Sequence, residues 1–261
     1  EGPDHPGTGT TLNNLASLYE AMGQYAQALP LFQRALAISE KAEGPDHPST
    51  GTTLNNLASL YEALGQYAQA LPLYQRALAI VEKSRGSNHP VTGASLNNLA
   101  GLYEALGQHA QALPLYQRAL AIAERSEGPG HPSTAVRLNN LAGLYQHIGQ
   151  YAQALPLFQR ALTILEKSQG TDHPQTGTSL NNLAGLYWVM GQYAQALPLL
   201  YRAEHIAAVA GDPKLQWMSN SGIAAILARQ GDPASAIFWG KQAVNTIQSL
   251  RGGLINLDRE L

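Results

Sequence analysis

Polar side chains that could bind a ligand or do chemistry recur at a fixed spacing in this chain of 261 residues. Two adjacent asparagines lie inside five copies of Leu-Asn-Asn-Leu-Ala, which begin at Leu12–Ala16 and recur every 42 residues. A histidine, first His5, precedes each copy with the same period. A carboxamide has two donors and an acceptor and can satisfy a peptide N–H and C=O together, whereas imidazole can bind a metal or move a proton. The repeats therefore offer two candidate ladders, one of amides and one of imidazoles.

The imidazole ladder is expected to be structural. Its members are His5, His47, His89, His131 and His173. Packed helices lie about 8–10 Å apart, whereas metal-bound nitrogens lie about 2.0–2.1 Å from a single ion, so equivalent histidines cannot share a metal. We expect each His-Pro pair to pack and hydrogen-bond at the start of a helix, and we predict no metal site.

Motifs for catalysis are missing from the sequence. No serine lies in a Gly-x-Ser-x-Gly motif, and no Gly-x4-Gly-Lys phosphate loop occurs. The chain has no cysteine, which excludes disulfides and thiolate metal ligands. Acidic residues recur singly at equivalent positions of the repeats. We therefore predict that this chain is not an enzyme and uses no cofactor.

Composition argues against nucleic acid and membrane partners. Charged residues make up 13% of the chain, about half of the usual ~25%, and the net charge is −2. There is no strongly basic region to attract nucleic acid or anionic lipid. No apolar run approaches the ~20 residues that span a bilayer. We expect a cytoplasmic protein whose partners are proteins or peptides.

The 42-residue period itself predicts a helical repeat architecture. In the first repeat Leu12, Leu15 and Leu18 follow at spacings of three, which places them on one helix face. Gly23 is expected to end that helix, and a second helix is expected from Tyr25 to about Lys41. It would contain Pro30 as a regular bend. Neither helix can bury its apolar stripe alone, so the sequence predicts an all-α stack of about six helix-turn-helix repeats.

The repeat boundaries follow from the period. Five full repeats are expected at 1–42, 43–84, 85–126, 127–168 and 169–210. A degenerate sixth or capping repeat follows at 211–250, where the amide pair becomes Ser221-Gly222, and residues 251–261 are expected to be a tail or a linker to a further domain. Because Glu1–Pro6 is repeated at Glu43–Pro48, the chain is expected to begin inside a longer array.

The pattern resembles a known family. Leu12-x2-Leu15-Ala16-x2-Tyr19, followed by Gly23 and Ala28-x3-Phe32, is similar to the tetratricopeptide repeat signature. The longer period, the Gly-x-x-His-Pro loop and the Leu-Asn-Asn-Leu-Ala motif resemble the kinesin-light-chain type of this repeat. The resemblance implies a right-handed α-α superhelix whose first helices line a concave groove that holds extended peptides. The segment 236–245 resembles the linker helix before a caspase-like CHAT protease domain in many bacterial proteins, and we expect a bacterial origin.

The family frame assigns candidate groove residues. The first asparagine of each pair would face the groove, at Asn13, Asn55, Asn97, Asn139 and Asn181. The second would face the adjoining repeat, at Asn14, Asn56, Asn98, Asn140 and Asn182. About two turns further along the first helix stand Glu20, Glu62, Glu104, Gln146 and Trp188, with His147 beside Gln146. We predict a ligand segment with basic residues at one end and an apolar anchor near Trp188. The alternative is that both amides only tie adjacent repeats together.

Second-helix arginines form a further column. They are Arg34, Arg76, Arg118, Arg160 and Arg202, and the family frame places them on the convex side as a solvated column. Three functions remain open at this point. The chain could be a peptide-binding scaffold, the sensor or regulatory arm of a CHAT-type protease or signalling protein, or a structural spacer that self-associates through its exposed ends.

Overall fold

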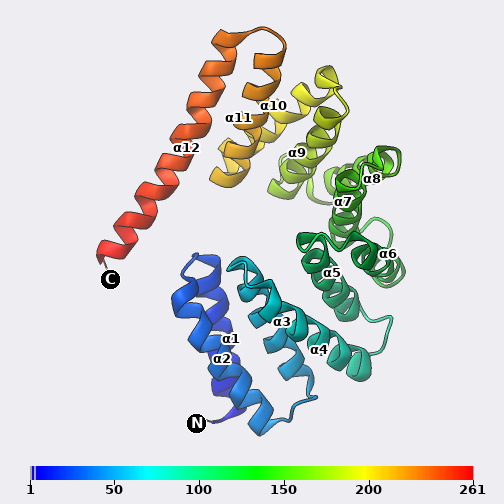
Figure 1. Ribbon diagram of the computed structural model, residues 1–261, viewed down its shortest axis with the longest axis vertical. Coiled ribbons are helices and arrows are strands. Elements are labelled where there is room, and N and C mark those ends of the chain that lie inside the picture. The colour runs from blue at the N-terminus through cyan, green and yellow to red at the C-terminus, as the bar shows by residue number, and fades with distance from the viewer. Residues whose placement is uncertain (1, 3, 261) are drawn as a thin grey trace. The chain divides into compact units, whose positions relative to one another are not determined.

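Twelve α-helices make up the part of the chain that the computed structural model describes, which is residue 2 and residues 4–260, with side chains described to residue 249. No strand occurs among these residues (Figure 1). The helices are α1 Pro6–Ala21, α2 Tyr25–Ala42, α3 Pro48–Ala63, α4 Tyr67–Arg85, α5 Pro90–Ala105, α6 His109–Ser126, α7 Pro132–His147, α8 Tyr151–Gln169, α9 Pro174–Val189, α10 Tyr193–Ala210, α11 Pro213–Arg229 and α12 Pro233–Glu260. The predicted all-α class of helix-turn-helix repeats is confirmed.

The helices divide into two compact units. The N-terminal unit, Glu1–Pro129, contains α1 to α6, and the C-terminal unit, Gly130–Leu261, contains α7 to α12. Within each unit the two helices of a repeat pack against each other, and the second helix packs against the first helix of the next repeat. First helices of successive repeats also touch: α1 contacts α3 and α3 contacts α5 in the N-terminal unit, and α9 contacts α7 and α11 in the C-terminal unit.

The residues that were expected to start and stop the helices do so. Pro6 is the first residue of α1, where its missing N–H is not needed, and Gly23 after α1 has a φ of +73°. Glycine adopts this left-handed conformation without the steric penalty of a Cβ atom. The helix α2 continues from Tyr25 to Ala42 through Pro30 without a break. Local chemistry therefore positions both helices of each repeat.

The core is shared between neighbouring repeats. Ala16, Ala28 and Phe32 of the first repeat are fully buried and pack with Leu57 and Leu60 of the second. The alanines let the helices approach closely, while the ring fills the space between them. Because each repeat supplies half of the next core cluster, first helices are held side by side and present one continuous face in each unit.

The last helix extends beyond the expected sixth repeat. Residues 251–260, which the sequence suggested as a tail or linker, continue α12 to Glu260. In the described part of the chain, no helix has both the length and the apolar character that crossing a bilayer requires.

Candidate functional site on the first-helix faces

The recurring histidines cap the first helices. The Nδ1 atom of His5 accepts a hydrogen bond from the backbone N–H of Gly7 at 3.0 Å, and His89 accepts from Val91 at 3.2 Å. The side chains of His47, His131 and His173 likewise each accept a hydrogen bond from the backbone N–H of the residue two positions later in the chain. Each imidazole thus satisfies one of the N–H groups that a helix start leaves without a partner. The predicted structural role of the His-Pro pairs is confirmed.

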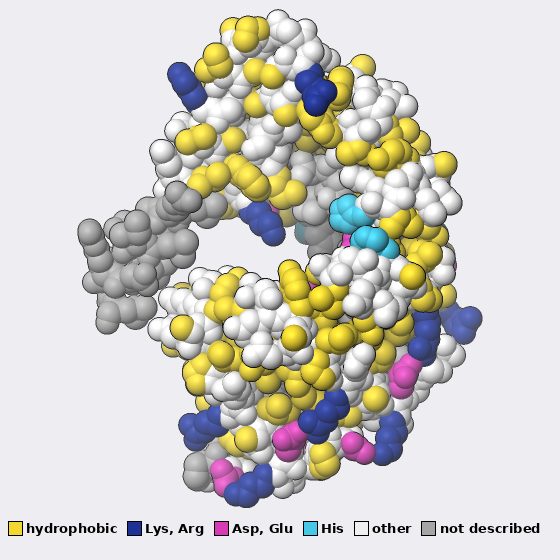
Figure 2. Space-filling model, in the orientation of Figure 1, with side chains coloured by type: hydrophobic (Ala, Val, Ile, Leu, Met, Phe, Trp, Pro, Cys, Tyr) yellow, Lys and Arg dark blue, Asp and Glu magenta, His cyan; other side chains and the backbone are white. Residues whose placement is uncertain are grey.

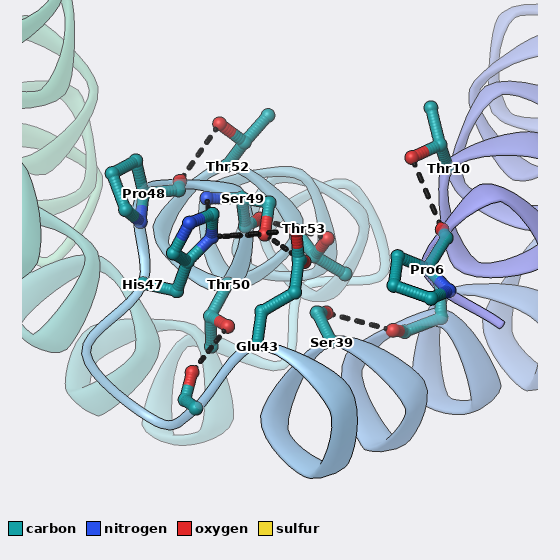
Figure 3. A network of polar contacts seen from close by, with 12 residues as sticks. Pro6, Thr10, Ser39, Glu43, His47, Pro48, Ser49, Thr50, Thr52 and Thr53 are labelled. Atoms are coloured by element: carbon teal, nitrogen blue, oxygen red, sulfur yellow. Dashed lines mark hydrogen bonds and ion pairs between the residues drawn. The ribbon is translucent and has the colours of Figure 1, made fainter. Parts of the chain in front are cut away.

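A polar cluster around His47 places a serine and a carboxylate beside the imidazole (Figure 3). His47 Nδ1 lies 2.8 Å from Ser49 Oγ, but the serine hydroxyl donates to the Glu43 carboxylate. A nucleophilic serine must instead give its proton to the histidine, which a third group orients. The cluster therefore closes the loop between α2 and α3 and does not activate a nucleophile. Among the described residues, no group of histidine and acidic side chains is arranged to hold a metal ion.

Replacing His47 by alanine is expected to cost about 1 kcal/mol of stability, because the capping acceptor of α3 is lost. Urea denaturation followed by circular dichroism measures this change. His205→Ala is the control, since His205 is exposed inside α10 and caps no helix. Equal losses in the two variants would contradict the capping role.

The paired asparagines link successive first helices. Asn56 Nδ2 donates to Asn13 Oδ1 at 3.2 Å, and Asn98 Nδ2 donates to Asn55 Oδ1 at 3.1 Å. The second asparagine therefore reaches back to the preceding repeat, and the first asparagine receives its hydrogen bond. Both amides belong to the framework in the N-terminal unit, which favours the alternative that they tie repeats together. Asn13 and Asn55 remain half-exposed.

In the remaining repeats the first asparagines differ in exposure and partners. Asn97 and Asn181 keep only 9% and 8% of their surface exposed. Asn139 Oδ1 accepts from Ser179 Oγ of the next first helix at 3.3 Å. The amide ladder predicted from the sequence is therefore not uniform, and only part of it is open to a ligand.

Three glutamates lie about two turns beyond the asparagines on α1, α3 and α5. Ser59 donates to Glu20 at 3.0 Å, Tyr74 donates to Glu62 at 2.9 Å and Tyr116 donates to Glu104 at 2.8 Å. All three carboxylates are half-buried. We call Glu20, Glu62 and Glu104 the carboxylate row. Sequence reasoning missed the tyrosine donors, although the change from Phe32 to Tyr74 at equivalent positions was a visible signal.

Burial raises the pKa of Glu20 and Glu62 above the ordinary value, because desolvation penalises the charged carboxylate. The hydrogen bonds from Ser59 and Tyr74 offset part of that rise. Within the described residues, no lysine or arginine forms an ion pair with Glu20 or Glu62. Among the described residues, these two carboxylates have hydroxyl groups as their side-chain partners and no ion pair that would balance their charge.

The second-helix arginines have carboxylate partners. Arg76 lies 2.6 Å from Glu40, Arg118 lies 2.7 Å from Glu82, and Arg202 lies 2.6 Å from Glu166 of the preceding second helix. Arg76 also donates to the Pro45 carbonyl at 3.0 Å. These arginines bridge successive repeats, so the expectation of a merely solvated column is wrong for them. These arginine–glutamate ion pairs were not evident from the sequence, because the partners are 36 residues apart.

In the C-terminal unit the first-helix face is less charged. Gln146 is half-buried and His147 is exposed at the end of α7. Trp188 at the end of α9 packs against Tyr193 with ring centroids 5.2 Å apart, and the Arg229 guanidinium lies 5.2 Å from the Trp188 ring centre. A cavity of about 350 Å³ opens beside Trp188, and Asn181 also lines it. Of the predicted site residues in this unit, Asn181 and Trp188 therefore come together, whereas Gln146 and His147 do not line the cavity.

On the face that Figure 2 shows, charged side chains do not gather in one patch. On this face the lysines, arginines and acidic residues are scattered among polar and hydrophobic side chains. The arrangement favours local contacts with a partner over long-range attraction of a polyanion.

Comparison with known proteins places the chain in a family. The tetratricopeptide repeat model matches residues 7–83, 49–125, 91–167 and 133–208. The crystal structure of the nearly identical TPR-like repeats of a Podosopora anserina protein described as a kinesin light chain is 32% identical, with a TM-score of 0.65 over 80% of this chain and 99% of that one.

Two further structures share the fold at lower identity. BtubC (BKLC) from P. vanneervenii is 21% identical, with a TM-score of 0.69 over 90% of this chain and 92% of its own. A Rap protein complexed with Competence and Sporulation Factor is 17% identical, with a TM-score of 0.67 over 92% and 75%. No curated protein matches the sequence. The chain belongs to the tetratricopeptide repeat family of protein-interaction scaffolds, and its repeats are of the kinesin-light-chain type.

Proposed function

We propose that this chain is a scaffold that binds an extended, basic protein segment along the first-helix face of its N-terminal unit. The observation that supports this most directly is the carboxylate row. Glu20 and Glu62 are half-buried, have raised pKa values and lack an ion-pair partner in the described structure. A cationic side chain placed there would stabilise the charged carboxylates that burial now penalises.

The two faces of the repeats differ in how their carboxylates are balanced. On the second helices Glu40 and Glu82 each have an arginine of the next repeat as a partner. On α3, Glu62 has the Tyr74 hydroxyl as its single partner within the part of the chain that the structure describes, and this hydroxyl fixes the carboxylate without neutralising it. Side chains that are fixed, partly desolvated and left with unbalanced charge are typical of binding sites.

The geometry of the row suits an extended chain. Stacked first helices repeat at roughly 10 Å, and an extended peptide advances about 3.3 Å per residue. Every third residue of such a peptide would therefore meet the next glutamate. Asn13 and Asn55, half-exposed on the same face, are placed to hydrogen-bond the peptide backbone between these contacts.

The family and its fold support a role in protein binding. Tetratricopeptide repeats are interaction scaffolds, and the Rap protein of similar fold is complexed with Competence and Sporulation Factor. The C-terminal unit adds an uncharged and aromatic first-helix face around Trp188. We propose that the first-helix face of the N-terminal unit takes a basic stretch and that the first-helix face around Trp188 takes an apolar anchor.

The test uses fluorescein-labelled peptides with lysine at every third position, and their binding is followed by fluorescence anisotropy. The double variant Glu62→Gln/Glu104→Gln keeps acceptors for Tyr74 and Tyr116 but removes two charges, so we expect affinity to fall about tenfold or more. Glu82→Gln on the second helix is the matched control and is expected to bind normally. Asparagine-to-alanine variants are a poorer test, because they also break hydrogen bonds between repeats.

Two outcomes of this experiment would refute the proposal. In one, the lysine peptide and an uncharged peptide of equal length bind equally well. In the other, the double glutamine variant and Glu82→Gln lose affinity to the same extent.

Self-association is a second candidate function, supported by the exposed face of α1. Leu15, Leu18 and Met22 keep 39%, 56% and 41% of their surface exposed. The equivalents of Leu15 and Leu18 in the second repeat, Leu57 and Leu60, are buried against the first repeat. We propose that, in the isolated 261-residue chain, a second copy covers this face.

Multi-angle light scattering between about 1 and 100 μM tests this candidate. The apparent mass of the 261-residue chain is expected to rise with concentration, because burying the apolar face of α1 is favourable. Leu18→Glu is expected to hold the mass at that of one chain. A constant mass for the unmodified chain would exclude this contact.

A further inference from the structure

Asn181 in the C-terminal unit lacks the asparagine donor that Asn13 and Asn55 have in the N-terminal unit. In the N-terminal unit Asn13 and Asn55 each accept a hydrogen bond from the second asparagine of the next repeat. The glycines that end α9 and α11, Gly191 and Gly231, are 40 residues apart, so the sixth repeat is two residues shorter. In this register Gly222 occupies the position of the asparagine that would donate to Asn181.

The Asn181 side-chain oxygen is therefore a buried acceptor without a donor among the described residues. Asn181 is 8% exposed, and its Oδ1 accepts no hydrogen bond within the described structure. A buried carboxamide oxygen without a donor is destabilising, so a hydrogen bond donated by a ligand would be favourable there. Glycine at 222 removes the expected donor, and Leu200 of α10 packs where a Cβ atom at this position would lie.

Asn181 and Gly222 both line the cavity beside Trp188. The cavity has a volume of about 350 Å³, within the range of small-molecule sites. Asn181, Gly185, Trp188, Trp217 and Gly222 contribute to its lining, together with Leu200 from α10. A Cβ atom added at Gly185 would meet no other atom within 4 Å, so this wall faces open space. Apart from Asn181 and Ser221, the lining is apolar or aromatic.

We propose that this cavity is a binding site for an uncharged aromatic group that carries one hydrogen-bond donor. The ring would pack against Trp188 and Trp217, where aromatic pairs are favoured at centroid distances of about 4.5–7 Å. Its N–H or O–H would donate to Asn181 Oδ1. A carboxylate is rejected at that point, because it offers no donor to the amide oxygen. A free small molecule and the side chain of a protein ligand present the same chemistry.

The site is independent of the basic segment proposed for the N-terminal unit. All of its lining residues lie in the C-terminal unit, whereas the carboxylate row lies in the other. If the chain bound the lysine peptide but no aromatic probe, only the aromatic site would be contradicted, and the proposed binding of a basic segment would stand.

Indole and benzothiophene are the test probes, because they have the same shape and differ in the N–H donor. Isothermal titration calorimetry with the full chain is expected to show saturable binding, about tenfold tighter for indole. Asn181→Leu is expected to remove the preference for indole while keeping apolar binding. An acetylated, amidated glycine-rich peptide carrying a single tryptophan distinguishes a protein ligand, which would bind more tightly than indole, from a small molecule, which would not.

Filling the cavity gives the structural control. Gly185→Leu is expected to abolish indole binding, and Gly143→Leu, at the same position of the preceding repeat, is expected to keep it. A Cβ atom at either glycine meets no other atom within 4 Å, so both variants should fold. The proposal is overturned if indole does not bind the unmodified chain, if benzothiophene binds equally well, or if Gly185→Leu binds indole normally.

Discussion

Replacing Glu62 and Glu104 together by lysine is expected to weaken binding of the lysine peptide by about a hundredfold. The change turns two attractive contacts into repulsive ones on a partly buried face, where charges are screened less than in open solvent. Anisotropy titrations at several salt concentrations measure the effect. Affinity of the unmodified chain should fall with added salt, whereas affinity of the variant should rise, because salt screens the new repulsive contacts.

The same interaction predicts how binding depends on pH. Burial raises the pKa of Glu62 above its ordinary value of 4.5, so the folded chain holds this proton more tightly than the unfolded chain. Stability of the free chain should therefore decline as pH rises from 4.5 through the raised pKa. Binding of a cationic peptide should strengthen over this interval, because the ligand favours the ionised carboxylate.

The variant Glu62→Gln tests whether both pH trends arise at this carboxylate. It should remove the part of the stability decline that arises at Glu62, and it should also weaken the rise in affinity with pH. A control peptide with glutamine in place of lysine is expected to show no rise. An affinity for the lysine peptide that falls as pH rises would be incompatible with the carboxylate row as its binding site.

Leu60→Ala is expected to destabilise the N-terminal unit by about 3–5 kcal/mol. Leu60 is fully buried and packs with Ala16, Ala28 and Phe32 of the preceding repeat, so truncation leaves a cavity between repeats. In a repeat array stability depends on the contacts between neighbours, and the first two repeats should unfold first. Guanidinium denaturation and amide hydrogen exchange over α1 to α4 measure both effects.

The control for this prediction is the same substitution one repeat earlier. Leu18 stands 42 residues before Leu60 at the equivalent position, but it is 56% exposed. Leu18→Ala is therefore expected to cost less than about 1 kcal/mol. A similar loss in both variants would show that helix propensity, and not packing between repeats, determines stability here.

The sequence alone determined the helical repeat architecture and the residues at which the helices begin and end. The 42-residue period, the apolar spacing of Leu12, Leu15 and Leu18, and the positions of Pro6 and Gly23 predicted the helix pairs. These features could be inferred because they are local: helix periodicity, capping and glycine conformation act within a few residues. The structural role of the histidines followed in the same way, from a spacing too large for a shared metal.

Only the tertiary structure decided which side chains of neighbouring repeats meet. Asn56 reaches Asn13 across 43 residues, and Arg76 reaches Glu40 across 36. The resemblance turned Asn56 toward the adjoining repeat without naming the atom that it meets, and nothing in the sequence indicated the ion pair of Arg76 with Glu40. Such pairs depend on how far one helix is shifted along the next, which a repeat period does not specify. The same geometry joined the Asn13 and Asn56 amides, left Glu62 with only a hydroxyl partner among the described residues, and brought Asn181, Trp188 and Gly222 to one cavity.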